Sequence, residues 1–221
     1  HRDLPSFPTR RSSDLAIFEY WYQNSSNSAW YADESGVTYW DSSNPGSASM
    51  NRNVTTQSTS TVHGGSSAAQ LKSTWIVIKF AAASLFTGEF DHLVGTNGAV
   101  LNWGVPFTSR PTSLHGYLQY DPGNINRGNQ PSGAPAKGEP DLCQIYCALT
   151  TETITVDNTN MSTLPDWQND PRVVAYGALP ASLCVNSNGA WKEFNIPLEY
   201  HSLTTKPTHL IIVCSASKYI A

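Results

Sequence analysis

Residues 102–123 read NWGVPFTSRPTSLHGYLQYDPG, and this stretch decides the fold class. Within it the segment 114–120 alternates between two kinds of side chain, as a half-buried β-strand does. One face would carry Leu114, Leu118 and Tyr120, and the other His115, Tyr117 and Gln119. The Asp-Pro-Gly sequence that follows is a turn signal that ends the strand.

Short strands separated by turn-rich loops are predicted along the rest of the chain. The clearest are 74–80 (TWIVIKF), 141–150 (DLCQIYCALT), 191–200 (WKEFNIPLEY) and 208–214. Pro197 indicates a sheet edge or a bulge in the third of these. No long stretch has apolar residues at helical spacing. Loops without crossover helices predict an all-β fold, an antiparallel two-sheet β-sandwich such as a jelly roll.

The composition excludes two classes of partner. Only 14% of the 221 residues are charged and the net charge is −4, whereas nucleic-acid binding calls for a basic stripe. No apolar run approaches the roughly 18 residues of a membrane span. The chain is therefore expected to bind no nucleic acid and to contain no membrane span, and it is expected to be a monomer.

Neither end of the chain has the pattern of a natural domain boundary. His1–Leu15 (HRDLPSFPTRRSSDL) resembles the translation of a common sequencing adapter, so it is treated as a non-native leader. Residues 16–221 are then expected to form a single β-sandwich domain. The chain stops soon after an apolar run at 209–214, which predicts truncation at the C-terminus.

The four cysteines are Cys143, Cys147, Cys184 and Cys214. The first two lie on the predicted strand 141–150 and share a face with Ile145, which favours buried free thiols. A disulfide involving Cys184 or Cys214 is the alternative. Metal binding has the least support, because the pairs are too widely spaced and no histidine is close.

Several segments together resemble the putative carbohydrate metabolism domain family, known as PCMD. They are AASLFTGEF, GVPFTSRPTSLHGYLQYDPG, DLCQIYCAL, WKEFNIPLEY and KPTHLIIVCSASKY, and the resemblance runs from about Phe18 to Tyr219. It implies a jelly roll akin to galactose-binding and carbohydrate-binding modules. Such domains sit in exported or lipid-anchored bacterial surface proteins that harvest polysaccharide, which implies a periplasmic or cell-surface location.

The chain departs from that family in two ways. Similar proteins continue with a final strand that bears adjacent aspartates, so the resemblance implies a missing strand here. A structural Ca²⁺ site that used those carboxylates with Glu19 would be incomplete, and no other cofactor is expected. The family often has Lys and Asp where this chain has Gln119 and Gln144. We expect these two amides to face the same side of one sheet, because replacing only one member of an ion pair would leave a charge unpaired.

Sugar binding calls for flat aromatic surfaces and planar polar groups. The candidate ligand-binding residues are Trp103, Arg110, Tyr117, Gln119, Gln144 and Tyr146. In the alternative interpretation Arg110 is structural and pairs with Asp141, and the tyrosines fill the sandwich. A glycosidase needs two carboxylates about 5–9.5 Å apart. Glu89 and Asp91 in TGEFD are weak candidates, and no dense acidic motif is present.

The sequence therefore predicts a non-catalytic carbohydrate-binding domain whose partner is a polysaccharide or oligosaccharide. A divergent glycoside hydrolase on the same fold is one alternative. A structural or adhesion domain of the cell surface is the other. Aromatic side chains along a groove would favour binding, close carboxylates in a cleft would favour hydrolysis, and buried aromatics without a groove would favour the structural role.

Overall fold

The computed structural model describes residues 18–76, 79–126 and 133–219. Almost every element is an antiparallel strand, which confirms the predicted all-β fold. The helical elements of this part of the chain are α1 (Asn44–Ala48) and the single turns η1 (Met161–Thr163) and η2 (Ala181–Leu183). None of them has the length and apolar character that crossing a membrane requires. The adapter-like leader lies outside the described residues.

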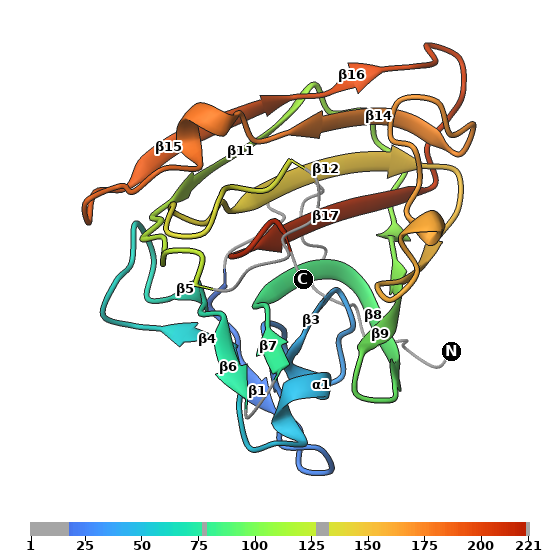
Figure 1. Cartoon of the computed structure of the whole chain (residues 1–221). Helices are drawn as coiled ribbons and strands as arrows, with labels where there is room; N and C mark the ends of the chain where they lie inside the picture. Colours follow the sequence, from blue (N-terminus) through green and yellow to red (C-terminus); the bar gives the residue numbers. More distant parts are fainter. Residues whose placement is uncertain (1–17, 77–78, 127–132, 220–221) are drawn as a thin grey trace.

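One large curled sheet organises the molecule (Figure 1). Its strands, in spatial order, are β13 (Ile154–Asp157), β9 (Gly98–Trp103), β8 (Ser84–Val94), β17 (His209–Ser215), β12 (Gln144–Thr150), β14 (Val173–Ala178) and β16 (Glu199–Tyr200). Two short strands join it from the side, β3 (Trp40–Ser42) on β8 and β10 (Val105–Pro106) on β17.

Four two-stranded pairs complete the fold. They are β1 (Tyr22–Gln23) with β2 (Trp30–Tyr31), β4 (Thr55–Ser58) with β5 (Ala68–Leu71), β6 (Thr74–Ile76) with β7 (Lys79–Ala81), and β11 (Ser113–Leu118) with β15 (Lys192–Pro197). Pro197 is the last residue of β15 and lies opposite Ser113, the N–H of Leu198 still donates to the Thr112 carbonyl, and the chain then continues as β16 beside β14. This agrees with the edge position that the proline predicts.

The prediction that residues 74–80 form one strand is wrong. They divide between β6 and β7, which pair with each other, and the rings of Trp75 and Phe80 lie 5.4 Å apart. In one extended strand the two rings would lie on opposite faces and about 17 Å apart along the chain. Alternation indicates the face that a side chain occupies, but it does not say which strand is the partner.

Strand β8 turns a corner at Thr87 and Gly88, and this corner shapes the sheet. Before it β8 pairs with β17 and β3, and after it β8 pairs with β9. Gly88 has a φ of +136°, and an added Cβ would lie 2.1 Å from the carbonyl oxygen of Asn102. Only glycine combines this conformation with so close an approach of two backbones.

Side chains replace the backbone hydrogen bonds that the corner interrupts. The buried hydroxyl of Thr87 donates to the carbonyl of Leu210 and accepts from the N–H of Ile212, both at 2.9 Å. On the other side, the Asp41 carboxylate accepts from the N–H of Phe90 at 2.7 Å. Buried backbone groups need such partners, so the bend is fully bonded at these points.

The corner allows the sheet to bury both of its faces. Strands β9 and β13 fold over one face and enclose a cluster that contains Phe86, Trp103 and Tyr146. The opposite face carries the largest cluster, with Leu85, Leu149, Leu210 and Ile212. The strands of two layers therefore enclose apolar side chains, as in other β-sandwiches.

Asn44 fixes the β4–β5 hairpin beside this second face. Its fully buried amide donates to the carbonyls of Trp30 and Thr55 and accepts from the N–H groups of Val54 and Thr55. The hydroxyl of Thr55 also donates to the carbonyl of Ser84 on β8. These bonds place the hairpin as one wall of a groove.

We predict that Thr87→Val lowers the free energy of unfolding by roughly 2 to 4 kcal/mol, because it leaves a buried carbonyl and a buried N–H without a partner. Thr155→Val is the control, since Thr155 is an exposed strand residue whose hydroxyl bonds only Asn102 among the described contacts. Urea unfolding of both variants measures the difference. Equal stability of the two would contradict the role given to Thr87.

Asp41 predicts a pH dependence of stability. Burial raises the pKa of its carboxyl to about 6, although the N–H groups of Phe90 and Ser42 act in the opposite direction. Since the unfolded pKa is about 3.9, the folded state holds a proton between about pH 4 and 6 that the unfolded state lacks. Stability contributed by this group therefore falls as pH rises through that interval, by roughly 3 kcal/mol at most.

Asp41→Asn should remove this slope, whatever its effect on stability at a single pH. Denaturant unfolding at steps between pH 4 and 7 measures it, with Asp91→Asn, which changes an exposed carboxylate, as the control. An unchanged slope in Asp41→Asn would contradict the assignment.

Candidate functional site

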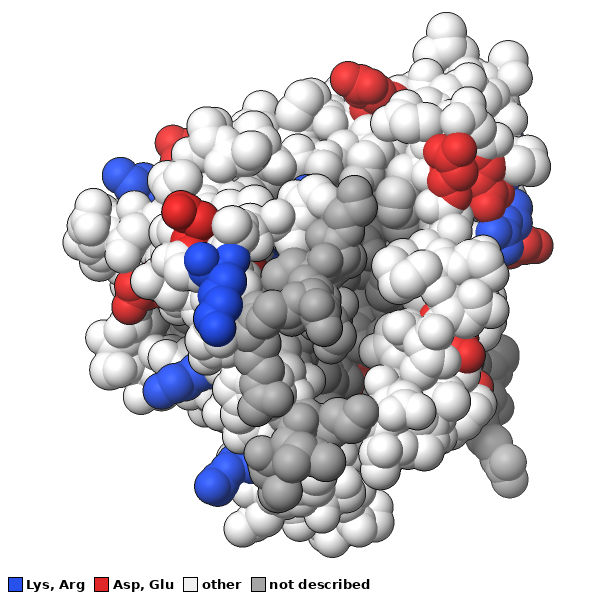
Figure 2. Space-filling view, in the orientation of Figure 1, with Lys and Arg blue, Asp and Glu red and all other residues white. Residues whose placement is uncertain are grey.

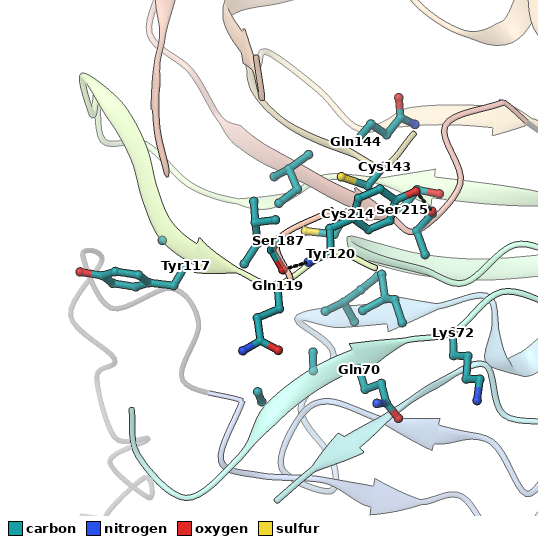
Figure 3. A pocket seen from close by; sticks show the side chains of 18 of the residues that line it. Gln70, Lys72, Tyr117, Gln119, Tyr120, Cys143, Gln144, Ser187, Cys214 and Ser215 are labelled. Atoms are coloured by element: carbon teal, nitrogen blue, oxygen red, sulfur yellow. Dashed lines mark hydrogen bonds between the residues drawn. The ribbon is translucent and has the colours of Figure 1, made fainter. Parts of the chain in front are cut away.

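A groove of about 2100 Å³ lies between the β4–β5 hairpin and the strands β11, β12 and β17. Its floor is apolar and includes Trp40, Leu85 and Ile212 of the main cluster. In Figure 3, Gln70 on β5 and Lys72 just after it lie across the groove from Gln119, which follows β11. The groove thus joins an apolar floor to polar walls.

Three aromatic rings meet at one end of this groove. His63 comes from the β4–β5 loop, Tyr117 from β11, and Trp191 from the residue before β15. The His63 and Tyr117 rings stack with centroids 3.5 Å apart, and the Trp191 ring meets His63 edge-on at 5.7 Å. Tyr117 is 40% exposed. We refer to His63, Tyr117 and Trp191 as the aromatic mouth.

The β11–β15 strand pair holds Tyr117 in this exposed position. Leu118 is buried, so the alternation of the strand turns Tyr117 outward. Gly116 pairs with Phe194 in register, and the Phe194 ring covers the space where a Cβ of residue 116 would lie. Phe194 and Leu118 are both in a third buried cluster, which anchors the β11–β15 strand pair on the large sheet.

Polar side chains surround the aromatic mouth. His115 Nε2 and Glu193 Oε1 lie 2.7 Å apart on the exposed face of the β11–β15 strand pair. The Gln119 amide donates to the Gly189 carbonyl at 2.8 Å, and Asn186 donates to Asp121 at 3.1 Å. These contacts hold amide and carboxylate groups in fixed orientations near the rings.

The structure places Tyr117, Gln119 and Gln144 along the lining of the groove. Gln144 begins β12 and also lines a small cavity with Tyr146 and Tyr176. Figure 3 shows its side chain directed away from Gln119. The prediction that the two amides face the same side of one sheet is wrong, because β11 pairs with β15 in a sheet of its own, whereas β12 lies in the large sheet.

Trp103 and Tyr146 belong to the apolar core and do not line the groove. Each is 6% exposed, and the Trp103 Nε1 is buried without a hydrogen-bond partner. Burial raises the pKa of the Tyr146 hydroxyl. Trp167 packs over both rings and stacks on Tyr176 at 5.3 Å. For these two residues the alternative interpretation, in which aromatics fill the sandwich, is the one that fits.

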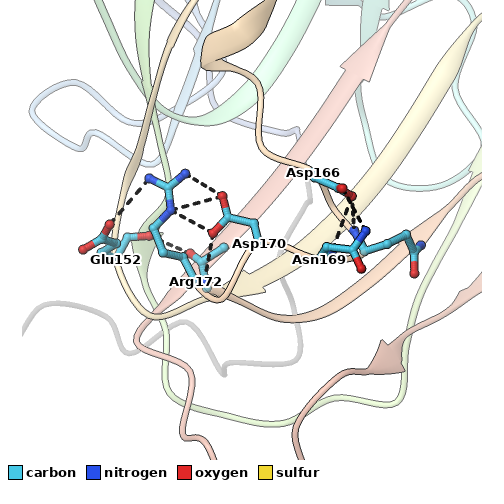
Figure 4. A network of polar contacts seen from close by, with 7 residues as sticks. Glu152, Asp166, Asn169, Asp170 and Arg172 are labelled. Carbon is cyan, nitrogen blue, oxygen red and sulfur yellow. Dashed lines mark hydrogen bonds and ion pairs between the residues drawn. The ribbon is translucent and has the colours of Figure 1, made fainter.

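A polar network holds the loop that carries Trp167 (Figure 4). Arg172 binds Asp170 in a bidentate manner, with Nε–Oδ1 and Nη2–Oδ2 distances of 2.9 and 2.7 Å, and lies 3.5 Å from Glu152. Asp166 accepts from the side chain of Asn169 at 2.8 Å. The network fixes a lid over the core, so these charged groups have a structural role.

Arg110 also has a structural role, but its partners differ from those expected. Its guanidinium donates to the carbonyls of Ser202 and Thr205 and lies 4.3 Å over the Tyr200 ring. The expected pairing with Asp141 is wrong, because that carboxylate accepts from the hydroxyl of Ser217. Arg110 supports the loop after β16 and does not line the groove.

The weak catalytic and metal candidates lie elsewhere. Glu89 and Asp91 are exposed on β8 beyond its corner and do not line the groove. A register shift between Phe90 and His92 breaks the strand alternation between them. Glu19 accepts from the N–H and hydroxyl of Ser66, which lowers the pKa of its carboxyl. Across the described ranges no three His, Cys, Asp or Glu residues are grouped to hold a metal ion.

Sequence reasoning missed His63 and Trp191. His63 stands in a Ser/Thr/Gly-rich loop without periodicity, so no pattern connects it with a strand 54 residues later. Trp191 begins a predicted strand, and its aromatic character was the one available signal.

Charged side chains are sparse on the face shown in Figure 2, where Lys and Arg stand singly. A site for a polyanion would be expected to gather them.

Residues 14–221 match the model of the family described as "putative carbohydrate metabolism domain". The chain belongs to this family. The comparison with curated proteins gives no significant match. Membership in the putative carbohydrate metabolism domain family agrees with the resemblance of the segments around 84–120 and 141–219.

Two solved structures share the fold of this family member. One is titled a putative glycoside hydrolase from Bacteroides vulgatus ATCC 8482, with a TM-score of 0.67, 20% identity, and coverage of 92% of this chain and 91% of that one. The other is titled a putative glycoside hydrolase from Bacteroides thetaiotaomicron VPI-5482, with a TM-score of 0.63, 21% identity and 85% of this chain covered. The chain spans 64% of the length of that second structure.

We predict that Arg110→Ala lowers the free energy of unfolding by about 1 kcal/mol, because two carbonyls lose their donor and Tyr200 loses a stacked cation. Arg110→Lys should recover less than half, since one ammonium cannot reproduce the guanidinium fork. Thermal unfolding compares both with Lys206→Ala, a control in the same loop. Full stability of Arg110→Ala would contradict the structural role.

Proposed function

We propose that this domain binds a glycan in the groove, with the aromatic mouth as its principal contact. The observation that carries the proposal is the convergence of His63, Tyr117 and Trp191, from three separate segments, on one partly exposed position. Aromatic side chains left at a surface cleft, when the core already holds others, mark a binding site.

The chemistry of the groove suits a neutral sugar. His63 covers one face of Tyr117, so a sugar ring would stack its C–H face on the other face of Tyr117 or on Trp191. Side-chain amides and hydroxyls of the groove wall, among them Gln70, Gln119 and Asn188, can pair with sugar hydroxyls. The length of the groove, from the mouth to the apolar floor, favours an oligosaccharide or a polysaccharide segment over a monosaccharide.

The carboxylates favour binding over hydrolysis. Among the described residues that line the groove, Asp121 is the one carboxylate, and it is paired with Asn186. Hydrolysis by the common mechanism needs an acid and a second carboxylate across the scissile bond. The titles of the two structural neighbours keep hydrolysis as the alternative function, with Asp121 and the nearby Glu193 as the residues to test.

The proposal extends to the setting of the protein. A glycan-binding domain of this family would act outside the cytoplasm, at the cell surface or in the periplasm, as a monomer and without a catalytic cofactor. A structural Ca²⁺ ion that includes Glu19 is a separate proposal, which requires the Ser66 contacts to open.

We predict that Tyr117→Ala and Trp191→Ala each weaken glycan binding at least tenfold, because each removes a stacking surface. Tyr20→Ala is the matched control, since Tyr20 is 53% exposed and does not line the groove. A glycan array identifies a ligand, and calorimetry then measures the dissociation constants of all four proteins.

Release of new reducing ends is assayed in the same samples. Reducing ends that disappear in Asp121→Asn or Glu193→Gln would replace binding with hydrolysis as the function. An absence of both binding and release across a broad panel would reject the proposal and favour a structural domain.

A further inference from the structure

Two of the four cysteine thiols lie together beneath the β11–β15 strand pair. Cys143 precedes β12, and Cys184 follows η2, 41 positions later in the chain. Both are buried in the cluster that contains Phe194 and Leu118. Together with Lys218 they line a small cavity of about 120 Å³. Two segments far apart in sequence thus bring their sulfur atoms to one place.

The two thiols lie close enough for each to shift the pKa of the other. The Cys184 thiol also lies 3.7 Å from the Pro180 carbonyl, to which it donates. The neighbouring Cys143 thiol, together with the charge of Lys218, lowers the pKa of Cys184, whereas the Cys184 thiol and burial raise the pKa of Cys143. Cys147 and Cys214 differ, because burial raises the pKa of each thiol to about 12. Within the pair, Cys184 is therefore the thiol that ionises more easily and the better candidate for the attacking nucleophile.

We propose that Cys143 and Cys184 form a disulfide by thiol–disulfide exchange with a small oxidised disulfide. The Cys184 thiolate attacks one sulfur of the reagent, forms a mixed disulfide and releases one equivalent of the reduced thiol. Cys143 then loses its proton and attacks the Cys184 sulfur, which releases the second equivalent. The protein gives up two electrons and two protons, and the reagent gains both. The inference is independent of glycan binding.

The bond would lie where it can stabilise the groove. It would join the start of β12 to the turn after β14, two strands that pair from Tyr146 with Ala178 onward. The closed loop spans residues 143–184, and long loops restrict the unfolded chain most. The same cluster contains Leu118 and Phe194, the residues that anchor the β11–β15 strand pair.

The test uses the full 221-residue chain, purified reduced and incubated with oxidised glutathione. After an acid quench, unfolding and alkylation, intact mass counts the free thiols, and peptide mapping locates the bond. We expect two of the four cysteines to escape alkylation and one cross-linked peptide to join Cys143 to Cys184. The oxidised protein should melt about 10 °C higher than the reduced protein.

Serine variants separate the pairs. Cys184→Ser should keep all three remaining thiols, and Cys143→Ser should stop at a glutathione adduct on Cys184 because the resolving thiol is absent, whereas the controls Cys147→Ser and Cys214→Ser should each lose two. The wild-type peptide map decides the question even if a variant fails to fold. In the wild-type chain, four free thiols after oxidation, a glutathione adduct that persists on Cys184, or a bond to Cys147 or Cys214 would each overturn the proposal.

Discussion

The corner of β8 at Thr87 and Gly88 is the constraint on which the rest of the structure depends. A strand that leaves one neighbour for another exposes backbone groups, and these cannot remain unpaired in a core. Here the Thr87 hydroxyl supplies both missing partners on β17, and the Asp41 carboxylate supplies one beyond the bend. Gly88 provides the conformation and the space. Without this corner β9 and β13 could not cover the sheet.

The corner also divides the aromatic residues into two sets with different roles. On the side closed by β9 and β13, Trp103, Tyr146 and Trp167 pack against one another, and the loop clamped by Arg172 seals them from solvent. On the other side the β4–β5 hairpin leaves a groove. The aromatic residues at its mouth, represented by Tyr117, keep exposed surface. Tyrosine and tryptophan occur in both sets, so position in the curled sheet separates the core residues from those of the candidate site.

The third cluster couples the site to the sheet. It holds Phe194 over Gly116 and so keeps the β11–β15 strand pair in place. It also contains Cys143 and Cys184. An isolated pair of strands has only marginal stability, so the orientation of β11 and β15 depends on this packing. Any change in the covalent state of the two thiols would act on the same side chains that orient Tyr117.

The sequence by itself determined the fold class and the identity of most strands. Period-two alternation at 114–118 is a local property of an extended chain and survives in β11, and the apolar segments at 144–150 and 209–215 form the largely buried strands β12 and β17. It placed Tyr117 outward and Leu118 inward correctly. Pro197 marked β15 as an edge strand, because proline cannot donate to a ladder on a second side.

Only the tertiary structure decided which strands are neighbours and therefore which residues form the site. Alternation assigns a face within one strand but says nothing about its partner, so residues 74–80 became a hairpin, and β11 and β12 came to lie in different sheets. Arg110 likewise found carbonyls in a loop about 90 residues away. His63 and Trp191 joined Tyr117 through contacts between segments with no shared pattern. Such long-range contacts arise from the packing of the whole chain, which no local period of the sequence encodes.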